Sequence, residues 1–248
     1  LSLTNFNFNK DKASITIEGG LVNLDSLKIF LDILNKINIE NNIKKVNIYG
    51  NFNTKFLMKD IITSHKKDQQ DSVLEYVQSI TKTIEDSNTI FIANLNDIIQ
   101  GPALEISLSC NFINADRKTI FKINEIEKGF IPIFGSIQRL LRIVGYKKTL
   151  EILLLKKAIN FDDAKKLDII NSHNDNNLKI KNSKFFWDNS FTNTFIFYNS
   201  LIHSKIKNTN PAYNATLSSI FEGSICDYNA GLSVEKRWVK WLLNQQQF

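Results

Sequence analysis

Two glutamates are the side chains of this 248-residue sequence whose positions best suit acid–base chemistry. Glu105 follows a Gly101-Pro102 turn and opens an apolar, helix-like run, where the helix dipole also favours a carboxylate. Glu125 ends the stretch FKINE, and its simplest interpretation is a solvent-exposed loop carboxylate. Each glutamate taken alone is better explained by structure than by catalysis. Their spacing alone does not show that they meet.

The other groups that could do chemistry form no recognisable site. His65, His173 and His203 are scattered through polar stretches without the spacing of metal ligands, so we expect no metal. No arrangement of serine, histidine and aspartate can be identified from spacing alone. Cys110 and Cys226 have no CxxC spacing, which favours two buried free thiols in a reducing compartment over a disulfide.

The elements that must position these residues alternate between strands and helices. Strand-like runs cover residues 14–18, 45–49 and 89–93. Apolar residues at helical spacing predict helices over 27–34, 73–84, 146–157 and 161–167. Asp25 is the expected N-cap of the first of these helices. The alternation predicts an α/β fold.

A change of composition near residue 171 divides the sequence. Residues 171–183 are polar and rich in asparagine, as a surface loop or linker is. Helical periodicity returns from about Phe191, and Pro211 separates two expected helices. We therefore expect a core of residues 1–180 and a helical C-terminal segment of residues 181–248 that packs on the core.

Three consecutive segments resemble the signature region of the crotonase family, the enoyl-CoA hydratases and isomerases. GPALEISLSCNFINAD resembles the family's GGGxELALACDxRIAA segment. FKINEIEKGFIPIFGSIQRLLRIVG resembles FGxPExxLGxxPGxGGTQRLPRxVG, and LEILLLKKAINFDDAKKLDII resembles ALELxLTGxxIxAxEAxxxGLV. The three matches follow in order without gaps. Upstream, KKVNIYGN and KFLMKDI resemble more weakly the family's strand and its AGADI turn.

The end of the sequence adds a further match. SFTNTFIFYNSLI and NPAYNATLSSIFEGSICDYNAGLSVEKRWVKWLL resemble the helical segment that follows the hydratase core in multifunctional fatty-acid oxidation proteins. In those proteins a hydroxyacyl-CoA dehydrogenase follows. The resemblance therefore implies an acyl-CoA thioester as substrate, no cofactor, and a dehydrogenase domain or a thiolase subunit as partner.

The resemblance implies a crotonase-like spiral of ββα turns with Glu105 and Glu125 as the catalytic pair. In hydratases the two glutamates hold a water and add it across a 2-enoyl-CoA, because one takes a proton from water and the other delivers one to the α-carbon. Two backbone N–H groups form an oxyanion hole for the thioester carbonyl. The oxyanion-hole positions match Lys59 and Pro102. Lys66 and Lys67 lie where the family grips the CoA phosphates, although a solvated charge pair explains them equally well.

The sequence departs from the family pattern at the oxyanion hole. Pro102 has no backbone N–H, and loss of one oxyanion donor typically costs about 10²–10³ in rate. The turn around Lys59 has lost its glycine, and Asp97 and Ile133 replace family glycines as well. We therefore expect a weakened oxyanion hole. The alternative is a degenerate, non-catalytic crotonase that binds acyl-CoA or a protein partner.

The family's QR dipeptide matches Gln138 and Arg139, which we expect to support the structure rather than the chemistry. The net charge of +6 and the pI of about 9.1 suggest an anionic partner, for which nucleic acid, acidic lipid and a phosphorylated cofactor all fit. A genomic bias toward lysine is the simpler explanation. A distant third hypothesis is a basic nucleic-acid-binding protein, which no basic stripe or recognised motif supports. No run of about 18 apolar residues predicts a membrane span. We expect a cytoplasmic protein of fatty-acid β-oxidation.

Overall fold

The computed structural model describes residues 3–18, 21, 23–40, 42–50, 67–171, 187–206 and 210–245. The chain forms two compact units. Unit 1 comprises Leu1–Lys122 and Ile159–Lys179, and unit 2 comprises Ile123–Ala158 and Ile180–Phe248. Residues 123–158 thus group with the C-terminal helices. The expected division into residues 1–180 and 181–248 stays a prediction.

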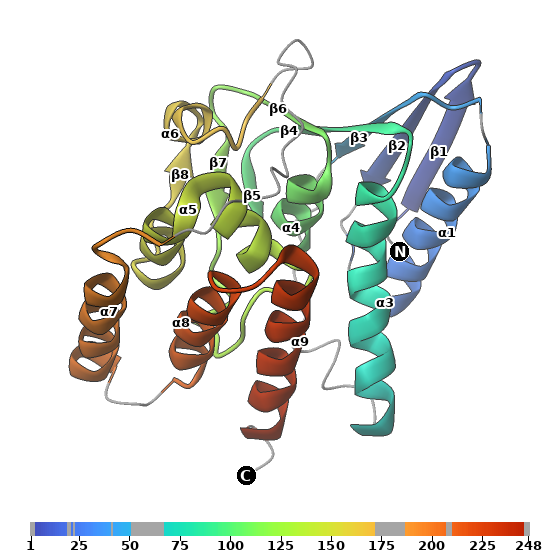
Figure 1. Cartoon of the computed structure of the whole chain (residues 1–248). Coiled ribbons are helices and arrows are strands. Elements are labelled where there is room, and N and C mark those ends of the chain that lie inside the picture. The colour runs from blue at the N-terminus through green and yellow to red at the C-terminus, as the bar shows by residue number, and fades with distance from the viewer. Residues whose placement is uncertain are drawn as a thin grey trace. The chain divides into compact units, whose positions relative to one another are not determined.

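A five-stranded sheet is the framework of unit 1 (Figure 1). Its strands, in spatial order, are β1 (Leu3–Asn9), β2 (Lys12–Glu18), β3 (Lys45–Gly50), β4 (Ile90–Leu95) and β6 (Phe112–Ala115). β1 pairs antiparallel with β2, and the later pairs are parallel. Along β2, buried Ala13, Ile15 and Ile17 alternate with half-buried Ser14 and Thr16, so one face packs on the core. The three predicted strands are confirmed.

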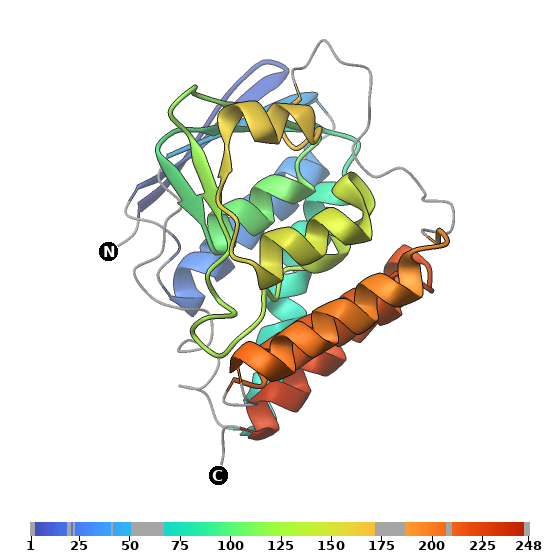
Figure 2. The ribbon, with the colours of Figure 1, turned by 90° about the vertical axis from the view of Figure 1, so that its left-hand side faces the viewer.

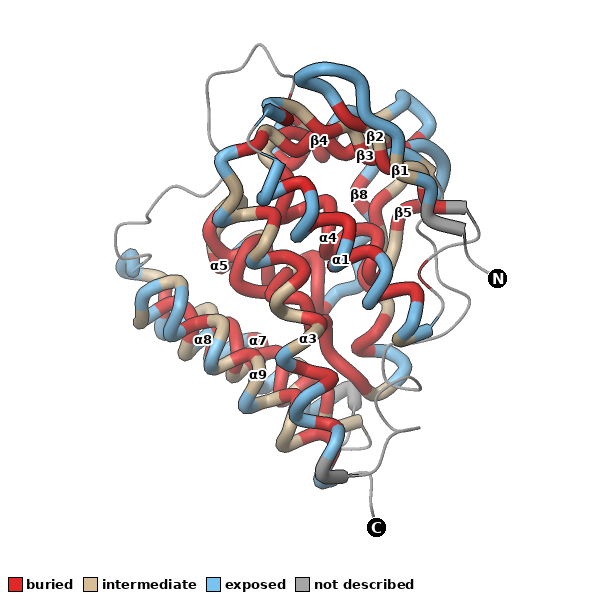
Figure 3. The backbone as a smooth tube through the Cα atoms, turned by 90° about the vertical axis from the view of Figure 1, so that its right-hand side faces the viewer, coloured by how far each residue is buried: buried red, intermediate tan, exposed pale blue. Residues whose placement is uncertain are grey.

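The helices described in unit 1 follow the strands. They are α1 (Leu24–Ile39), α3 (Lys67–Glu85), α4 (Pro102–Ser109) and α6 (Phe161–Lys166). Buried and exposed positions alternate along α1 and α3, as the amphipathic patterns predicted (Figure 3). The prediction of Asp25 as an N-cap is wrong. Asn23 caps α1, because its side chain accepts from the Ser26 N–H at 2.9 Å while the Ser26 hydroxyl accepts from the Asn23 N–H at 3.2 Å.

A second sheet in unit 1 completes a repeated pattern. Its strands, in order, are β5 (Ile98–Gln100), β7 (Ile120–Lys122) and β8 (Ile159–Asn160). The corner before β7 stacks on the corner before β5, because the Asp116 N–H donates to the Leu95 carbonyl at 3.1 Å and the Ile120 N–H donates to the Asp97 carbonyl at 3.0 Å. The chain order β4–β5–α4 and then β6–β7–α5 is the ββα repeat that was expected.

Helices fill the described part of unit 2 (Figures 1 and 2). They are α5 (Ser136–Leu154), α7 (Phe191–Ile206), α8 (Ala212–Gly223) and α9 (Tyr228–Gln245). The helix predicted over 146–157 is only the second half of α5 and ends earlier than expected. Gly145, with φ 78° and ψ 166°, kinks α5 in its middle and so interrupts the apolar periodicity. The helix predicted over 161–167 is confirmed as α6.

The C-terminal helices of unit 2 pack on α5 and on one another. α8 and α9 both contact α5, and α7 lies beside α8 (Figure 2). The Tyr146 ring lies 5.0 Å from that of Phe191 and 5.9 Å from that of Phe195, and Phe221 of α8 contacts both phenylalanines. Pro211 directly precedes α8, as predicted. No helix among the described residues is both long and apolar enough to span a bilayer.

Candidate active site

Glu105 lies deeply buried in the first turn of α4. Its N–H donates to the carbonyl of Gly101 at 3.1 Å, which is an intrahelical bond at the start of the helix. Gly101 has φ 58° and ψ −140°, a conformation that suits a residue without a Cβ. The Glu105 side chain is 2% exposed, and the other residues of α4 are buried as well. Burial this deep is unusual for a carboxylate that serves only the helix dipole.

Pro102 is the first residue of α4, where proline is well tolerated. The N–H of that position has no intrahelical acceptor, and the fixed φ of proline suits the start of a helix. The helix therefore forms without strain at Pro102. The consequence for chemistry is that this position supplies no N–H donor.

Glu125 lies in a tight turn between β7 and α5. Its carbonyl accepts from the N–H groups of Lys128 and Phe130, both at 3.0 Å. Its Oε2 accepts from the N–H of Asn124 at 3.0 Å, and the side chain is only 7% exposed. The interpretation as a solvent-exposed loop carboxylate is therefore wrong, because the turn directs the side chain away from water.

The surroundings of Glu125 favour its protonated form. Burial raises the pKa of the carboxyl above its ordinary value of 4.5, while the Asn124 N–H and the Lys128 ammonium oppose that rise. Desolvation is the largest of these effects. The carboxyl thus keeps its proton to a higher pH than a solvated glutamate. Such a group is suited to delivering a proton.

The other sequence-predicted site residues are described only in part. Glu105 belongs to unit 1 and Glu125 to unit 2, and their pairing across one site stays a prediction. Lys59 and Lys66 lie outside the described residues. Lys67 is the first residue of α3, and only its backbone is described. The oxyanion donor expected near Lys59 and the phosphate contacts therefore stay predictions.

The two replaced glycines differ in their consequences. Asp97 has φ 59°, so it keeps the positive φ that a glycine would adopt. Aspartate tolerates this region better than most residues. Ile133 is 1% exposed, in the segment that leads to α5. The corner at Asp97 thus has the positive φ that glycine adopts most easily.

Gln138 and Arg139 make structural contacts within unit 2, as the interpretation of the QR dipeptide predicted. Gln138 Nε2 donates to the Ser219 carbonyl at 3.2 Å, and a Cβ added at Gly223 or Gly231 would collide with the Gln138 side chain. Arg139 is 1% exposed and donates to the Phe134 carbonyl. The two side chains therefore help to join α5 to α8 and to the segment before α5.

Glu235 is a buried carboxylate that the sequence interpretation missed. It lies on α9 with no measurable exposure, and it accepts from the N–H groups of Gly135 at 2.8 Å and Gln138 at 3.3 Å. Burial raises its pKa to about 7, against the opposing effects of Arg139 and the helix N–H groups. A signal was present, because Glu235 is spaced four residues from both Gly231 and Val239 on the buried face of α9.

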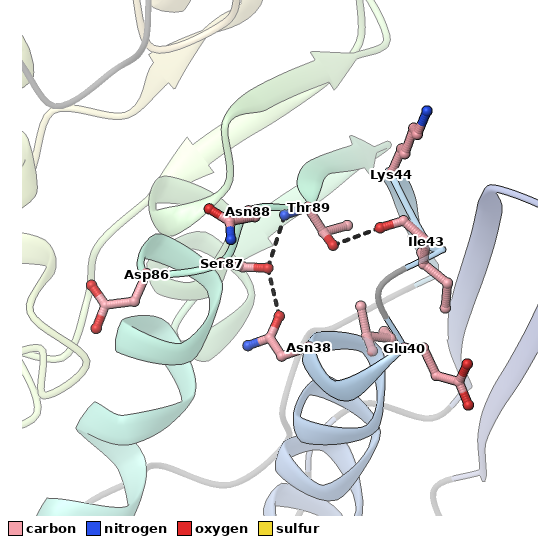
Figure 4. A pocket seen from close by; sticks show the side chains of 9 residues that line it. Asn38, Glu40, Ile43, Lys44, Asp86, Ser87, Asn88 and Thr89 are labelled. Atoms are coloured by element: carbon pink, nitrogen blue, oxygen red, sulfur yellow. Dashed lines mark hydrogen bonds between the residues drawn. The ribbon is translucent and has the colours of Figure 1, made fainter.

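Residues that line a polar hollow at the ends of α1 and α3 hydrogen-bond to one another (Figure 4). The Ser87 hydroxyl donates to Asn38 Oδ1 at 2.5 Å and accepts from the Thr89 N–H at 3.0 Å. The Thr89 hydroxyl donates to the Ile43 carbonyl at 2.8 Å. The charged groups on the rim point away from the hollow: Glu40, Lys44 and Asp86. The hollow therefore presents structural contacts rather than a ligand site.

Both cysteines are free thiols, as predicted. Cys110 is buried, whereas Cys226 is only half-buried, so the prediction of two buried thiols holds for Cys110 alone. Burial raises the pKa of the Cys226 thiol, which disfavours the reactive thiolate. Of the three histidines, His203 is described, and it is exposed on α7.

Curated proteins and solved structures resemble this chain over most of its length. A peroxisomal fatty acid beta-oxidation multifunctional protein of Arabidopsis thaliana is 29% identical over 171 residues, which cover 66% of this chain and 24% of that protein. The fatty acid oxidation complex subunit alpha of Shewanella frigidimarina is 25% identical over 146 residues, 56% of this chain and 21% of that protein. The matched part is thus less than a quarter of these relatives.

The fold and the family agree. The crystal structure of enoyl-CoA hydratase from Bacillus halodurans matches with a TM-score of 0.60 at 18% identity, over 98% of this chain and 99% of that one. This likeness shows the crotonase fold. The family model for enoyl-CoA hydratase/isomerase matches residues 27–178, which is more than half of the chain. The chain therefore belongs to the enoyl-CoA hydratase/isomerase family.

Proposed function

We propose that this chain acts on acyl-CoA thioesters of fatty-acid β-oxidation as an enoyl-CoA hydratase or isomerase with a weakened oxyanion hole. Glu105 and Glu125 are the proposed catalytic residues. The observation that carries the proposal is the environment of Glu125. It is a buried carboxyl with a raised pKa, in a turn that directs it away from water. Family membership supplies the reaction class.

The proposed hydration needs two carboxyl groups in opposite protonation states. Ionised Glu105 takes a proton from water while the water oxygen bonds to the β-carbon of a 2-enoyl-CoA. The electrons of the double bond move toward the thioester carbonyl, and protonated Glu125 delivers its proton to the α-carbon. The raised pKa of Glu125 supports its role as the donor.

A turnover assay with a short and a long 2-enoyl-CoA tests this proposal. The loss of 2-enoyl absorbance should depend on both glutamates, so Glu105→Gln and Glu125→Gln should each lower kcat by about 10²–10⁴. Thermal unfolding of each variant separates lost chemistry from lost folding. Unchanged turnover in a folded Glu125→Gln protein would remove Glu125 from the mechanism.

A second candidate function is acyl-CoA or protein binding without turnover. Pro102 at the first position of α4 favours it, because one expected oxyanion donor is absent by covalent structure. Calorimetric titration with a saturated acyl-CoA distinguishes the two functions. Binding together with absent turnover of every enoyl-CoA would favour the second.

The remaining expectations about partners and location stay proposals. The relatives named as a multifunctional protein and as an oxidation-complex subunit support a further domain or subunit as partner. The sequence resemblance makes a dehydrogenase domain or a thiolase subunit the proposed one. The absence of a cofactor requirement and the cytoplasmic location stay predictions. Purification of the natural protein together with its bound partners would test the proposal about partners.

A further inference from the structure

The C-terminal segment of the chain contacts the Glu125 turn directly. Asn210 lies just before α8, and its Nδ2 donates to the carbonyl of Ile126 at 2.7 Å. The same nitrogen lies 3.4 Å from the carbonyl of Glu127, which is a weaker contact. These are the two peptide carbonyls that immediately follow Glu125. An amide 84 residues away in the sequence therefore fixes the backbone that carries the proposed proton donor.

The Asn210 contact completes the hydrogen bonding of the turn. The Ile126 carbonyl also accepts from the Gly129 N–H at 3.1 Å, so two donors hold one carbonyl oxygen. Ile126 is 1% exposed, so water cannot readily replace the Asn210 donor when that hydrogen bond is lost. Without Asn210 we expect the turn to open toward water rather than keep this geometry.

Glu235 holds the far end of the same segment. It accepts from the N–H of Gly135, the N-cap of α5, at 2.8 Å. The backbone from Glu125 to α5 is thus fixed at its start by Asn210 and at its end by Glu235. Both side chains come from the C-terminal part of unit 2.

We propose that Asn210 is a positioning residue for Glu125, and that the C-terminal helices hold the proton donor in its desolvated place. The inference rests on the proposed function, because it assigns Asn210 to the same reaction. Its physical basis is the sensitivity of proton transfer to geometry, since a misplacement of about 1 Å can cost about 10²-fold in rate. A turn that opened would also return Glu125 to water and lower its pKa toward that of a solvated glutamate.

Mutation can separate the roles of the two hydrogen bonds that the Asn210 side chain makes. Its Oδ1 accepts from the N–H of Ala212, the first residue of α8, at 3.0 Å, while its Nδ2 reaches the Glu125 turn. A serine hydroxyl can accept from the same N–H but is too short to make the same contact with the turn. Asn210→Ser therefore removes the turn contact and keeps an acceptor oxygen, and Asn210→Ala removes both. Neither substitution adds a charge near Glu125.

Asp227 provides a matched control in the same unit. Its Oδ1 accepts from the Ala230 N–H at 2.9 Å at the start of α9, so Asp227→Ala also removes an acceptor oxygen at a helix start. Asn210→Ser and Asn210→Ala should lower kcat by about 10–100-fold with little change in the Kd of a saturated acyl-CoA. The alkaline limb of the pH profile of kcat/KM should move to lower pH. Asp227→Ala should leave that limb in place.

A carboxyl titration by ¹³C NMR supplies a readout that does not need turnover. The Glu125 resonance is assigned by its loss in Glu125→Gln, and its pKa should fall in both Asn210 variants but not in Asp227→Ala. An unchanged Glu125 pKa in both Asn210 variants would overturn the positioning role, whether or not the enzyme turns over. If the protein hydrates no enoyl-CoA while the pKa still falls, the proposed function fails and the positioning of Glu125 stands.

Discussion

The carboxylate of Glu235 on α9 accepts a hydrogen bond from the backbone N–H of Gly135 at 2.8 Å, directly before α5 begins. A carboxylate from one helix thus caps the N-terminus of another, where the helix dipole favours negative charge. The same carboxylate accepts from the Gln138 N–H and faces Arg139. Burial nevertheless raises its pKa to about 7, so its protonation changes near neutral pH.

The first prediction is that the free energy of unfolding falls as pH rises through the titration of Glu235. The pKa of Glu235 is about 7 in the folded protein and 4.5 in its ordinary, solvated state. Between these two pH values the folded state therefore holds a proton that the unfolded chain has released. The stabilisation is therefore complete below pH 4.5 and is lost as pH approaches 7. Its size is on the order of 3 kcal/mol. Urea denaturation at pH 4.5, 6 and 8 should show a smaller pH slope for Glu235→Gln than for the natural protein.

A destabilised variant with no titratable change is the control for that slope. Leu217→Ala, which removes a buried apolar side chain of α8 in the same helical unit, should lower stability at every pH while keeping the slope of the natural protein. An equal slope in Glu235→Gln and the natural protein would exclude Glu235 as the source of the pH dependence.

The second prediction concerns the close approach of Gly223 to Gln138. A Cβ at Gly223 would overlap the Gln138 amide, which packs between α5 and α8. Gly223→Ala should therefore cost about 1–3 kcal/mol of stability by overpacking. In a Gln138→Ala background the same substitution should cost much less, because the space is then free. Equal costs in both backgrounds, measured by urea denaturation, would show that the glycine is needed for another reason.

The sequence predicted those elements whose burial repeats with a regular period. Alternation identified β2, and the spacing of apolar residues identified α1 and α3. The apolar periodicity is interrupted at Gly145, where the kink in α5 shifts the buried face of the helix. Only the second half of α5 was therefore predicted.

The state of the candidate site depends on contacts that are distant in sequence. Nothing in FKINE shows that Glu125 is buried, because its turn is fixed by Asn210, which lies 84 residues beyond Ile126 in the sequence. Family resemblance identified Glu105 and Glu125 as candidates, and the structure supplied their burial. Glu235 was missed because a single carboxylate in an amphipathic pattern usually lies on the exposed face.

The third prediction is an alkaline limb in the pH profile that belongs to Glu125. If protonated Glu125 delivers the proton, kcat/KM should fall as pH rises through its pKa, which burial places above 4.5. The profile of kcat/KM between pH 4.5 and 9 should show this fall for the natural protein. In Glu125→Gln the limb should disappear along with most of the activity. A fall toward acid pH with the same pKa would instead make Glu125 the base.

The fourth prediction is that restoring the missing N–H at position 102 raises turnover. The reaction places negative charge on the thioester oxygen, which backbone donors stabilise. Pro102→Ala and Pro102→Gly both restore an N–H at the first position of α4. Each should raise kcat, by up to the roughly 10²–10³ quoted for one oxyanion donor. The Kd of a saturated acyl-CoA should change less, because contacts elsewhere contribute much of its binding.

Backbone flexibility is the competing explanation, and the neighbouring residue controls for it. Ala103→Gly loosens the same helix start as Pro102→Gly but adds no N–H donor. Both Pro102 variants should also lose about 0.4–1 kcal/mol of stability, because the unfolded chain gains conformational freedom without the proline. A gain in kcat for both Pro102 variants but not for Ala103→Gly therefore assigns the effect to the N–H group. If the natural protein turns over rapidly and neither Pro102 variant improves it, its oxyanion is stabilised by other groups. If the natural protein and both Pro102 variants bind acyl-CoA but turn over no enoyl-CoA, the non-catalytic function is favoured. A restored donor would then have no reaction to accelerate.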